Sequence, residues 1–338
     1  MIDPPVSPGP SGPTPADRDT AAGGRGPDGA PRFDQSVARG GYLWWYFDAL
    51  SDDGRHGLTV IAFVGSVFSP YYALGRALGR DDPEDYCALN IALYGDGGKR
   101  WSMTERARRH SQRSREAFRI GPSSLSWDGR CLTVNVHERC APIPFPVRGR
   151  IRLWPEGLCR FVADLDAAGR HRWGPIAPCA RVEVELQQPS LRWSGHAYMD
   201  ANDGAEPVER AFADWDWSRA IMANGDTTVI YDVRPLGGGE RVIAQRFRPD
   251  GSHAPFAVPP RHPLPGSLWR IGRQARGDAA APPTLLDTLE DTPFYVRSTI
   301  RSSLLGESVV SIHETLDVPR VISLPVRLML PWRMPRRP

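Results

Sequence analysis

Three polar side chains alternate along the segment RWSGHAYMDAN at residues 192–202. His196, Tyr198 and Asp200 occupy every second position, between apolar or very small neighbours. Successive side chains of a β-strand point to opposite faces, so these three would share one face. A solvent-facing strand usually carries Lys, Thr, Glu or Arg at such positions, and a core-facing strand carries Val, Ile or Leu. The row is therefore typical of the polar wall of a cavity.

A second pair lies in the preceding segment GRHRWGPIAP. His171 and Trp173 are two residues apart, so an extended chain would place them on one face. Each has an ordinary structural explanation, because a buried histidine usually has a core partner and a lone tryptophan usually packs. The five side chains nevertheless lie within thirty residues, in two extended segments. If both segments line one cavity, they supply a carboxyl group, imidazoles and aromatic rings together.

Several common reaction types lack their motifs in this sequence. There is no Gly-x-Ser-x-Gly elbow, no HExxH or closely spaced histidine pair for a metal, and no dinucleotide fingerprint after a strand. The adjacent pairs His137–Glu138 and His313–Glu314 would point to opposite strand faces. The remaining chemistry is acid–base catalysis with no metal and no cofactor. Burial favours a neutral carboxyl group, which can protonate an unactivated substrate while aromatic faces stabilise the resulting cation.

The composition is that of a soluble globular protein. The chain has 338 residues, 41% of them hydrophobic and 24% charged, with 42 basic against 39 acidic residues. This even charge and the lack of a recognition motif argue against a nucleic-acid partner. The N-terminus shows no signal-peptide pattern, and the apolar run at 58–68 is too short to cross a bilayer, so we expect a cytoplasmic protein. Buried free thiols are expected for the five cysteines, Cys87, Cys131, Cys140, Cys159 and Cys179, which form no CxxC pair.

Most of the chain is predicted to be β-structure. Residues 1–31, rich in Pro, Gly, Asp and Ala, are interpreted as a disordered leader. Short helical turns are plausible only at 205–221. Short aromatic and β-branched segments divided by tight turns predict an all-β fold of two antiparallel β-barrels, at 32–205 and 206–338. The predicted strands are 42–51, 58–68, 86–95, 124–138, 148–155, 159–166, 180–188, 190–200, 227–235, 240–251 and 308–318.

Two basic segments leave alternatives open. The arginine cluster from Arg106 to Arg119 is interpreted as a solvated loop rather than a patch for lipid headgroups. The C-terminal segment PVRLMLPWRMPRRP, residues 325–338, could be a closing strand with a charged tail or could rest on a membrane surface.

Two aromatic clusters are expected to serve structure. The aromatic residues at 44–47 (WWYF) are interpreted as barrel core rather than as the lining of a substrate channel. In ADWDWSRA, an Asp216–Arg219 pair beside Trp215 and Trp217 is expected to fix the junction between the two barrels.

Four segments together resemble a known enzyme family. GYLWWYFDALSDDG, the block HRWGPIAPCARVEVELQQPSLRWSGHAYMDAN, AFADWDWSRA and the closing HETLDVPR…MLPWRMPR are similar to the carotenoid 1,2-hydratases (hydroxyneurosporene synthases), over residues 33–337. The resemblance implies two lipocalin-like barrels and addition of water across the terminal C1–C2 double bond of acyclic carotenes such as neurosporene or lycopene, in photosynthetic bacteria. No cofactor is implied. The residues linked with catalysis in that family correspond to His171, Trp173, Tyr198 and Asp200, whereas a substrate-binding role for His196 is inferred from strand geometry alone.

The implied mechanism begins with a neutral Asp200 that protonates C2. Trp173 and Tyr198 would stabilise the tertiary cation at C1, and His171 would accept a proton from the attacking water or orient it. Asp200 would then regain its proton through His171 or His196. The expected partners are an acyclic carotenoid, water and possible peripheral contact with a membrane surface.

Two other classes of function stay open on this scaffold. A lipocalin-like protein could bind and carry a carotenoid or lipid without reaction, and a cofactor-free isomerase or cyclase would also need an acid in an aromatic pocket.

Overall fold

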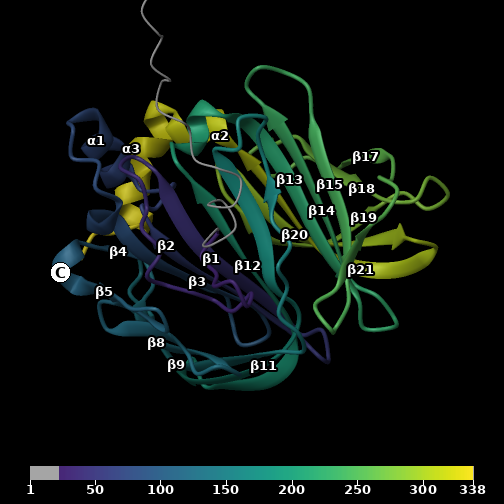
Figure 1. The fold of residues 1–338 in the computed structure, drawn as a ribbon, viewed down its shortest axis with the longest axis horizontal. Coiled ribbons are helices and arrows are strands. Elements are labelled where there is room, and N and C mark those ends of the chain that lie inside the picture. The colour runs from purple at the N-terminus through teal and green to yellow at the C-terminus, as the bar shows by residue number, and fades with distance from the viewer. Residues whose placement is uncertain (1–22, 338) are drawn as a thin grey trace, which may run out of the picture.

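A large antiparallel sheet forms the first part of the molecule. The computed structural model describes residues 23–337, and the sheet takes its twelve strands from residues 42–204 (Figure 1). Their order is β4-β3-β2-β1-β12-β11-β9-β8-β7-β6-β5, and β10 pairs with β11. The strands are β1 (Tyr42–Ser51), β2 (His56–Val64), β3 (Cys87–Gly95), β4 (Arg100–Arg106), β5 (Ser111–Arg113), β6 (Ala117–Ile120), β7 (Ser123–Trp127), β8 (Leu132–Arg139), β9 (Pro146–Pro155), β10 (Ala163–Asp164), β11 (His171–Gln188) and β12 (Leu191–Gly204).

A seven-stranded antiparallel sheet forms the second part, in the order β16-β15-β14-β13-β21-β20-β19. Its strands are β13 (Phe212–Ile221), β14 (Thr227–Pro235), β15 (Arg241–Phe247), β16 (His253–Pro255), β19 (Thr284–Asp291), β20 (Tyr295–Leu304) and β21 (Glu307–Asp317). The hairpin of β17 (Arg261–Leu264) and β18 (Arg273–Arg276) is separate from both sheets.

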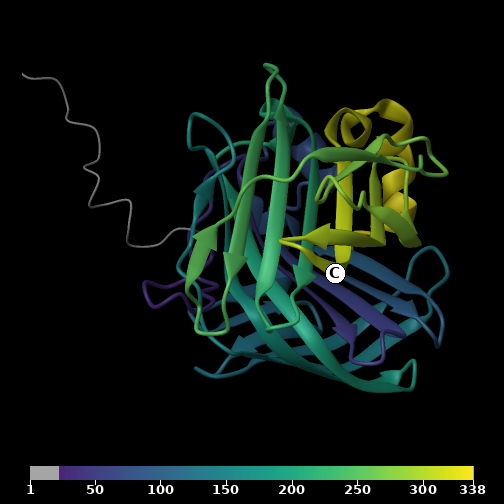
Figure 2. The same cartoon turned by 90° about the vertical axis from the view of Figure 1, so that its right-hand side faces the viewer.

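Three short helices lie together at one end of the molecule (Figures 1 and 2). They are α1 (Pro70–Ala77), α2 (Val318–Ile322) and α3 (Leu324–Arg333). The side chain of Ser69 accepts the amide of Tyr72 at the start of α1, and Asp317 accepts that of Arg320 at the start of α2. Single 3₁₀ turns occur at Pro83–Tyr86, Arg108–His110 and Val208–Arg210.

Strand β1 is buried on both faces and belongs to two cores. Leu43, Trp45 and Phe47 pack in a cluster whose described members include residues of the first sheet and none of the second. The alternate residues Trp44 and Tyr46 belong to a second cluster, which contains residues of both sheets. Because side chains alternate along a strand, the sequence YLWWYFDALS supplies large aromatic groups to both cores. The second cluster joins the two sheets.

The all-β prediction is confirmed. The chain leaves the first sheet at Gly204 and enters the second at Phe212, next to the predicted division between 205 and 206. The division into two domains stays a prediction, since one hydrophobic cluster spans both sheets.

Of the helical turns predicted at 205–221, the structure has only the turn at Val208–Arg210, because most of that segment forms β13. The C-terminal segment forms α3 rather than a closing strand. The five cysteines are buried and free, as predicted.

The prediction of a disordered leader is wrong for residues 23–31, while residues 1–22 lie outside the described part. Arg25 is buried and donates to the carbonyl oxygens of Phe161 (2.8 Å), Pro175 (2.9 Å) and Gly174. Trp45 donates from Nε1 to the carbonyl oxygen of Gly24 at 2.8 Å. A low-hydrophobicity segment can thus be held by one buried cation that satisfies three backbone acceptors.

We expect Arg25→Ala to lower the free energy of unfolding by about 2–4 kcal/mol, because it leaves three buried carbonyl groups without their charged donor. Chemical denaturation measures this difference. Arg32→Ala is the matched control: its ion pair with Asp34 is partly exposed, so its effect should stay within about 1 kcal/mol. An Arg25→Ala protein as stable as the control would contradict the anchoring role of residues 23–31.

Candidate active site

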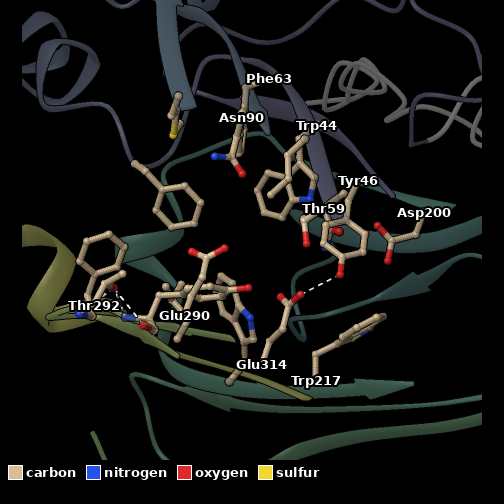
Figure 3. Close-up of a pocket in the computed structure, with 18 of the residues that line it drawn as sticks. Trp44, Tyr46, Thr59, Phe63, Asn90, Asp200, Trp217, Glu290, Thr292 and Glu314 are labelled. Atoms are coloured by element: carbon tan, nitrogen blue, oxygen red, sulfur yellow. Dashed lines mark hydrogen bonds between the residues drawn. The ribbon is translucent and has the colours of Figure 1, made fainter. Parts of the chain in front are cut away.

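A cavity lies between the two sheets, within the shared hydrophobic cluster. It encloses about 880 Å³, counting the space at its mouth, and most of its wall is aromatic or aliphatic. Five acidic or amide side chains interrupt this wall: Asn202 and the four labelled in Figure 3, which are Asn90, Asp200, Glu290 and Glu314. The other lining residues are Trp44, Tyr46, Thr59, Ile61, Phe63, Phe68, Trp101, Met103, Trp215, Trp217, Tyr231, Thr292, Phe294, Tyr295, Leu316 and Met334.

Asp200 is buried in the wall of this cavity, on β12. Its Oδ2 accepts two hydrogen bonds, from Trp173 Nε1 at 2.7 Å and from the Tyr198 hydroxyl at 2.9 Å. Its other oxygen, Oδ1, has no protein partner among residues 23–337. The structure therefore brings together three of the predicted residues: Trp173 and Tyr198 donate to one oxygen of Asp200, and the other oxygen has no hydrogen-bond donor in this range.

Burial raises the pKa of Asp200 to about 7. The hydrogen bonds from Trp173 and Tyr198 act in the opposite direction, and the negative charges of Glu314 and Asp48 add to the rise. Both donors are neutral, and no ion pair to Asp200 occurs in the described part of the chain. A carboxyl group without a cationic partner in an apolar wall keeps its proton up to about neutral pH.

A cluster of charged groups lies next to Asp200, where β1 faces the second sheet. Asp48 pairs with Arg219 at 2.5 Å and with Arg297 at 2.7 Å, and all three side chains are at most 2% exposed. Arg297 also pairs with Glu314. Tyr46 lies within hydrogen-bond distance of Glu314 Oε1 (2.7 Å) and Asp48 Oδ2 (2.8 Å). These contacts connect the two sheets through buried, compensating charges.

The structure places His171 behind the cavity wall. Its Nδ1 lies 2.9 Å from the Tyr42 hydroxyl and its Nε2 lies 3.6 Å from Glu206. Burial lowers the pKa of His171, so the ring is held neutral. His171 does not line the cavity; it supports Tyr42, whose ring stacks on the lining residue Trp44 with centroids 4.8 Å apart.

His196 lies apart from the other predicted residues. Its side chain is 47% exposed and its Nε2 lies 3.9 Å from Asp52. It shares a strand face with Tyr198, as the alternation requires. It lies two residues closer to the start of β12 than Tyr198 does, and it pairs with Leu50 of β1. The cavity ends before this position.

Comparison with known proteins identifies the family. The sequence model described as "Carotenoid hydratase CrtC" matches residues 60–338. The chain belongs to the carotenoid hydratase family. This confirms the resemblance seen in the sequence, and it makes the protein a hydro-lyase.

Two curated relatives agree with this assignment. An acyclic carotenoid 1,2-hydratase of Rubrivivax gelatinosus is 66% identical over 91% of this chain and 77% of its own length. Another, of Thiocapsa roseopersicina, is 53% identical over 93% of this chain and 78% of its own length. Among solved structures, a protein described as AttH from Nitrosomonas europaea has a TM-score of 0.59 at 15% identity, covering 93% of this chain and 99% of its own, which shows a shared fold.

Sequence reasoning misassigned several residues of this hydratase. Trp44 and Tyr46, predicted to be barrel core, line the cavity, whereas Trp45 and Phe47 are core as expected. Trp173 and Tyr198 are absent from the lining, and they act on the site through their hydrogen bonds to Asp200.

The junction residues also differ from the prediction. Arg219 pairs with Asp48 rather than with Asp216, which pairs with Arg234. Glu290 was missed, and Glu314 was considered only as part of the pair His313–Glu314 and set aside. The available signal for Glu314 was an acidic residue between Ile312 and Leu316 on one face of the predicted strand SVVSIHETLDV, but the partner strand that would explain it is distant in sequence.

We expect Asp200→Asn to stabilise the folded protein at alkaline pH. The folded state holds the Asp200 proton up to about pH 7, whereas the unfolded carboxyl group releases it near 3.8, so wild-type stability falls as pH rises between these values. The variant has no such penalty. Its advantage in unfolding free energy should grow from pH 4 to pH 8 by a few kcal/mol, about 4 at most. Denaturant titrations of both proteins at several pH values measure it, and a difference that does not change with pH would contradict the burial argument.

Proposed function

We propose that this carotenoid hydratase adds water across the terminal C1–C2 double bond of an acyclic carotene, with Asp200 as the acid. The observation that carries the proposal is the buried Asp200 in an aromatic cavity, with two neutral donors on Oδ2 and none on Oδ1. An unactivated alkene needs a proton donor and a site that tolerates a carbocation. The names of the two curated relatives support this substrate class.

The first step transfers the Oδ1 proton of Asp200 to C2, which leaves a tertiary cation at C1. Trp173 and Tyr198 remain as donors to Oδ2 and stabilise the carboxylate that forms. The π faces that meet the cation come from the lining residues Trp44, Tyr46 and Trp217, and each such contact can contribute about 2 kcal/mol in a desolvated site. His171 keeps the Tyr42–Trp44 stack in place. Water then attacks C1 and completes the tertiary alcohol.

We expect Asp200→Asn to abolish hydration and to keep carotenoid binding, because the amide retains the shape and the acceptor but has no acidic proton. Purified protein would be incubated with detergent-dispersed lycopene or neurosporene in heavy-oxygen water, and the pigments examined by mass spectrometry. Rates should fall by at least about 100-fold. Asp203→Asn, on the same strand but paired with Arg172, is the matched control.

Other outcomes of this experiment identify the alternatives. Tight carotene binding by wild type and variant with no new product would indicate a carrier. A product of unchanged mass would indicate an isomerase or cyclase.

We further propose that α3 rests on an anionic membrane surface. Leu324, Leu328 and Trp332 are four residues apart, share one helix face, and are 60–69% exposed. The opposite face is buried and leads to Met334, which lines the cavity. Residues 318–338 contain five arginines and no acidic residue. Arg320 and Arg336 are paired with Asp317 and Glu105, which leaves three arginines of this segment for anionic headgroups. No helix within residues 23–337 is long and apolar enough to span a bilayer.

The Arg106–Arg119 cluster offers less support for membrane contact. Arg106 is buried against Glu138, and Arg113 pairs with Glu84. These ion pairs occupy guanidinium groups that headgroup binding would need.

Replacing Leu328 and Trp332 together by Ser should weaken binding to phosphatidylglycerol vesicles by at least about tenfold, since two large apolar side chains no longer enter the lipid. Sedimentation with vesicles measures the bound fraction. Val310→Ser, at an exposed apolar position on β21, should bind like wild type. Equal binding by the double variant and the control would contradict the α3 surface.

A further inference from the structure

The attacking water must lose a proton, and the structure leaves this role open. His171, expected from the sequence to accept the proton or orient the water, lies behind the wall and does not line the cavity. Asp200 has just become a carboxylate and must be reset for the next cycle. Two further carboxyl groups line the same cavity, Glu290 and Glu314.

Glu314 is held so that one of its oxygens is engaged and the other is free. It lies in the middle of β21, opposite Arg297 of β20 and Trp217 of β13. Arg297 and the Tyr46 hydroxyl both contact Oε1. Hydrogen bonds within residues 23–337 leave Oε2 without a donor, and the side chain is 13% exposed in the cavity wall. Figure 3 shows Glu314 and Asp200 on either side of Tyr46.

The charges around Glu314 are balanced only if it is ionised. Two buried arginines, Arg219 and Arg297, face two carboxylates, Asp48 and Glu314. Asp48 contacts both arginines, and Glu314 takes the remaining charge of Arg297. A buried guanidinium stays protonated, so neutral Glu314 would leave one buried positive charge without a partner, at a large cost.

The other two carboxyl groups of the cavity have no such partner. Asp200 receives only neutral donors, and Glu290 is hydrogen-bonded by the neutral Tyr94 hydroxyl. In many enzymes, two neighbouring carboxyl groups have surroundings that favour opposite protonation states. The group kept protonated then serves as the acid, and the group kept ionised serves as the base. Among the three, Glu314 is the group whose surroundings favour the base.

We propose that Glu314 is the general base of the hydration, taking a proton from the attacking water through Oε2 while Arg297 and Tyr46 hold Oε1; this assignment rests on the proposed function. The C1–O bond forms as one O–H bond of water breaks, and that proton passes to Glu314. At this point Asp200 has lost one proton and Glu314 has gained one. Exchange with solvent water returns both to their starting states, so the net reaction is the addition of one water.

The pH dependence follows from the two carboxyl groups. Activity requires protonated Asp200 and ionised Glu314, so it should fall as pH rises above about 7 and fall again as pH drops through the pKa of Glu314. Burial raises the pKa of Glu314, and Arg297 and Tyr46 oppose this rise. The charged and titratable groups that face Glu314 from the neighbouring strands are Arg297 and Tyr295 on β20, Tyr46 and Asp48 on β1, Glu290 on β19 and Asp200 on β12.

Glu314→Gln tests the assignment, because the amide keeps the acceptor at Oε1 and cannot take a proton. Wild type and variant would be compared in heavy-oxygen water for labelled alcohol, kcat, KM and the pH profile. We expect kcat to fall by about 10²–10⁴-fold, KM to stay within about threefold, the acidic limb to disappear and the limb near pH 7 to remain. Glu307→Gln, on the same strand and outside the cavity, should keep the wild-type profile.

The other outcomes distinguish a failure of the proposed hydration from a failure of the assignment of Glu314 as the base. If wild type forms no labelled alcohol, the proposed function fails. If wild type forms it without an acidic limb, or if Glu314→Gln keeps wild-type kcat or keeps the acidic limb, the base assignment is overturned and hydration stands. Should the single variant not fold, the double variant E314Q/R297M removes one charge of each sign and leaves Asp48 paired with Arg219, and the same criteria apply to it.

Discussion

The site depends on one constraint: a carboxyl group is buried in an apolar wall with hydrogen-bond donors but no cation. Asp200 accepts from Trp173 and Tyr198, and burial raises its pKa to about 7. Two buried arginines lie nearby, yet both are directed at Asp48 and Glu314. If either guanidinium instead paired with Asp200, the carboxyl group would be ionised and could not protonate an alkene. The charge cluster therefore acts on the site in two ways: it joins the two sheets, and it directs both guanidinium groups toward Asp48 and Glu314 and away from Asp200.

The sheets position these groups through strand alternation. On β12, Tyr198 and Asp200 face the second sheet, while Ala197 and Met199 pack into the first core. On β1, Tyr46 and Asp48 face the same way and lie opposite Asp200 and Tyr198 in the register. Two neighbouring strands thus present four polar groups on one surface, and the second sheet covers that surface with Trp217, Arg297 and Glu314. The aromatic lining excludes water from most of the wall, which strengthens each electrostatic interaction inside.

The sequence was informative where local spacing decides the outcome. Alternation placed Tyr198 and Asp200 on one face, because this depends only on the strand period. The contact of Trp173 with Asp200 also needs the register of β11 against β12, in which Trp173 pairs with Asn202. The strand period could not show where the cavity ends. His196 was therefore grouped with Tyr198 and Asp200, although it lies outside the cavity. Glu314 and Arg219 depend on which strand of the second sheet faces β1, which is set by packing between residues more than 150 positions apart in the chain. Residues 23–31 have little hydrophobic character, and the contacts of Arg25 and Gly24 that hold them are made to residues distant in sequence. The C-terminal apolar residues suit a strand as well as a helix, and they form α3.

The most direct test of this account is the protonation state of Asp200 in the resting enzyme. Infrared difference spectra between wild type and Asp200→Asn, recorded from pH 4 to pH 9, isolate the carbonyl stretch of this one carboxyl group. A buried Asp200 with only neutral donors should give a protonated-acid band that persists through pH 5 and 6 and disappears with a midpoint near 7. A midpoint near 4, the value of an ordinary aspartate, would show that Asp200 is ionised at neutral pH and would contradict its role as the acid.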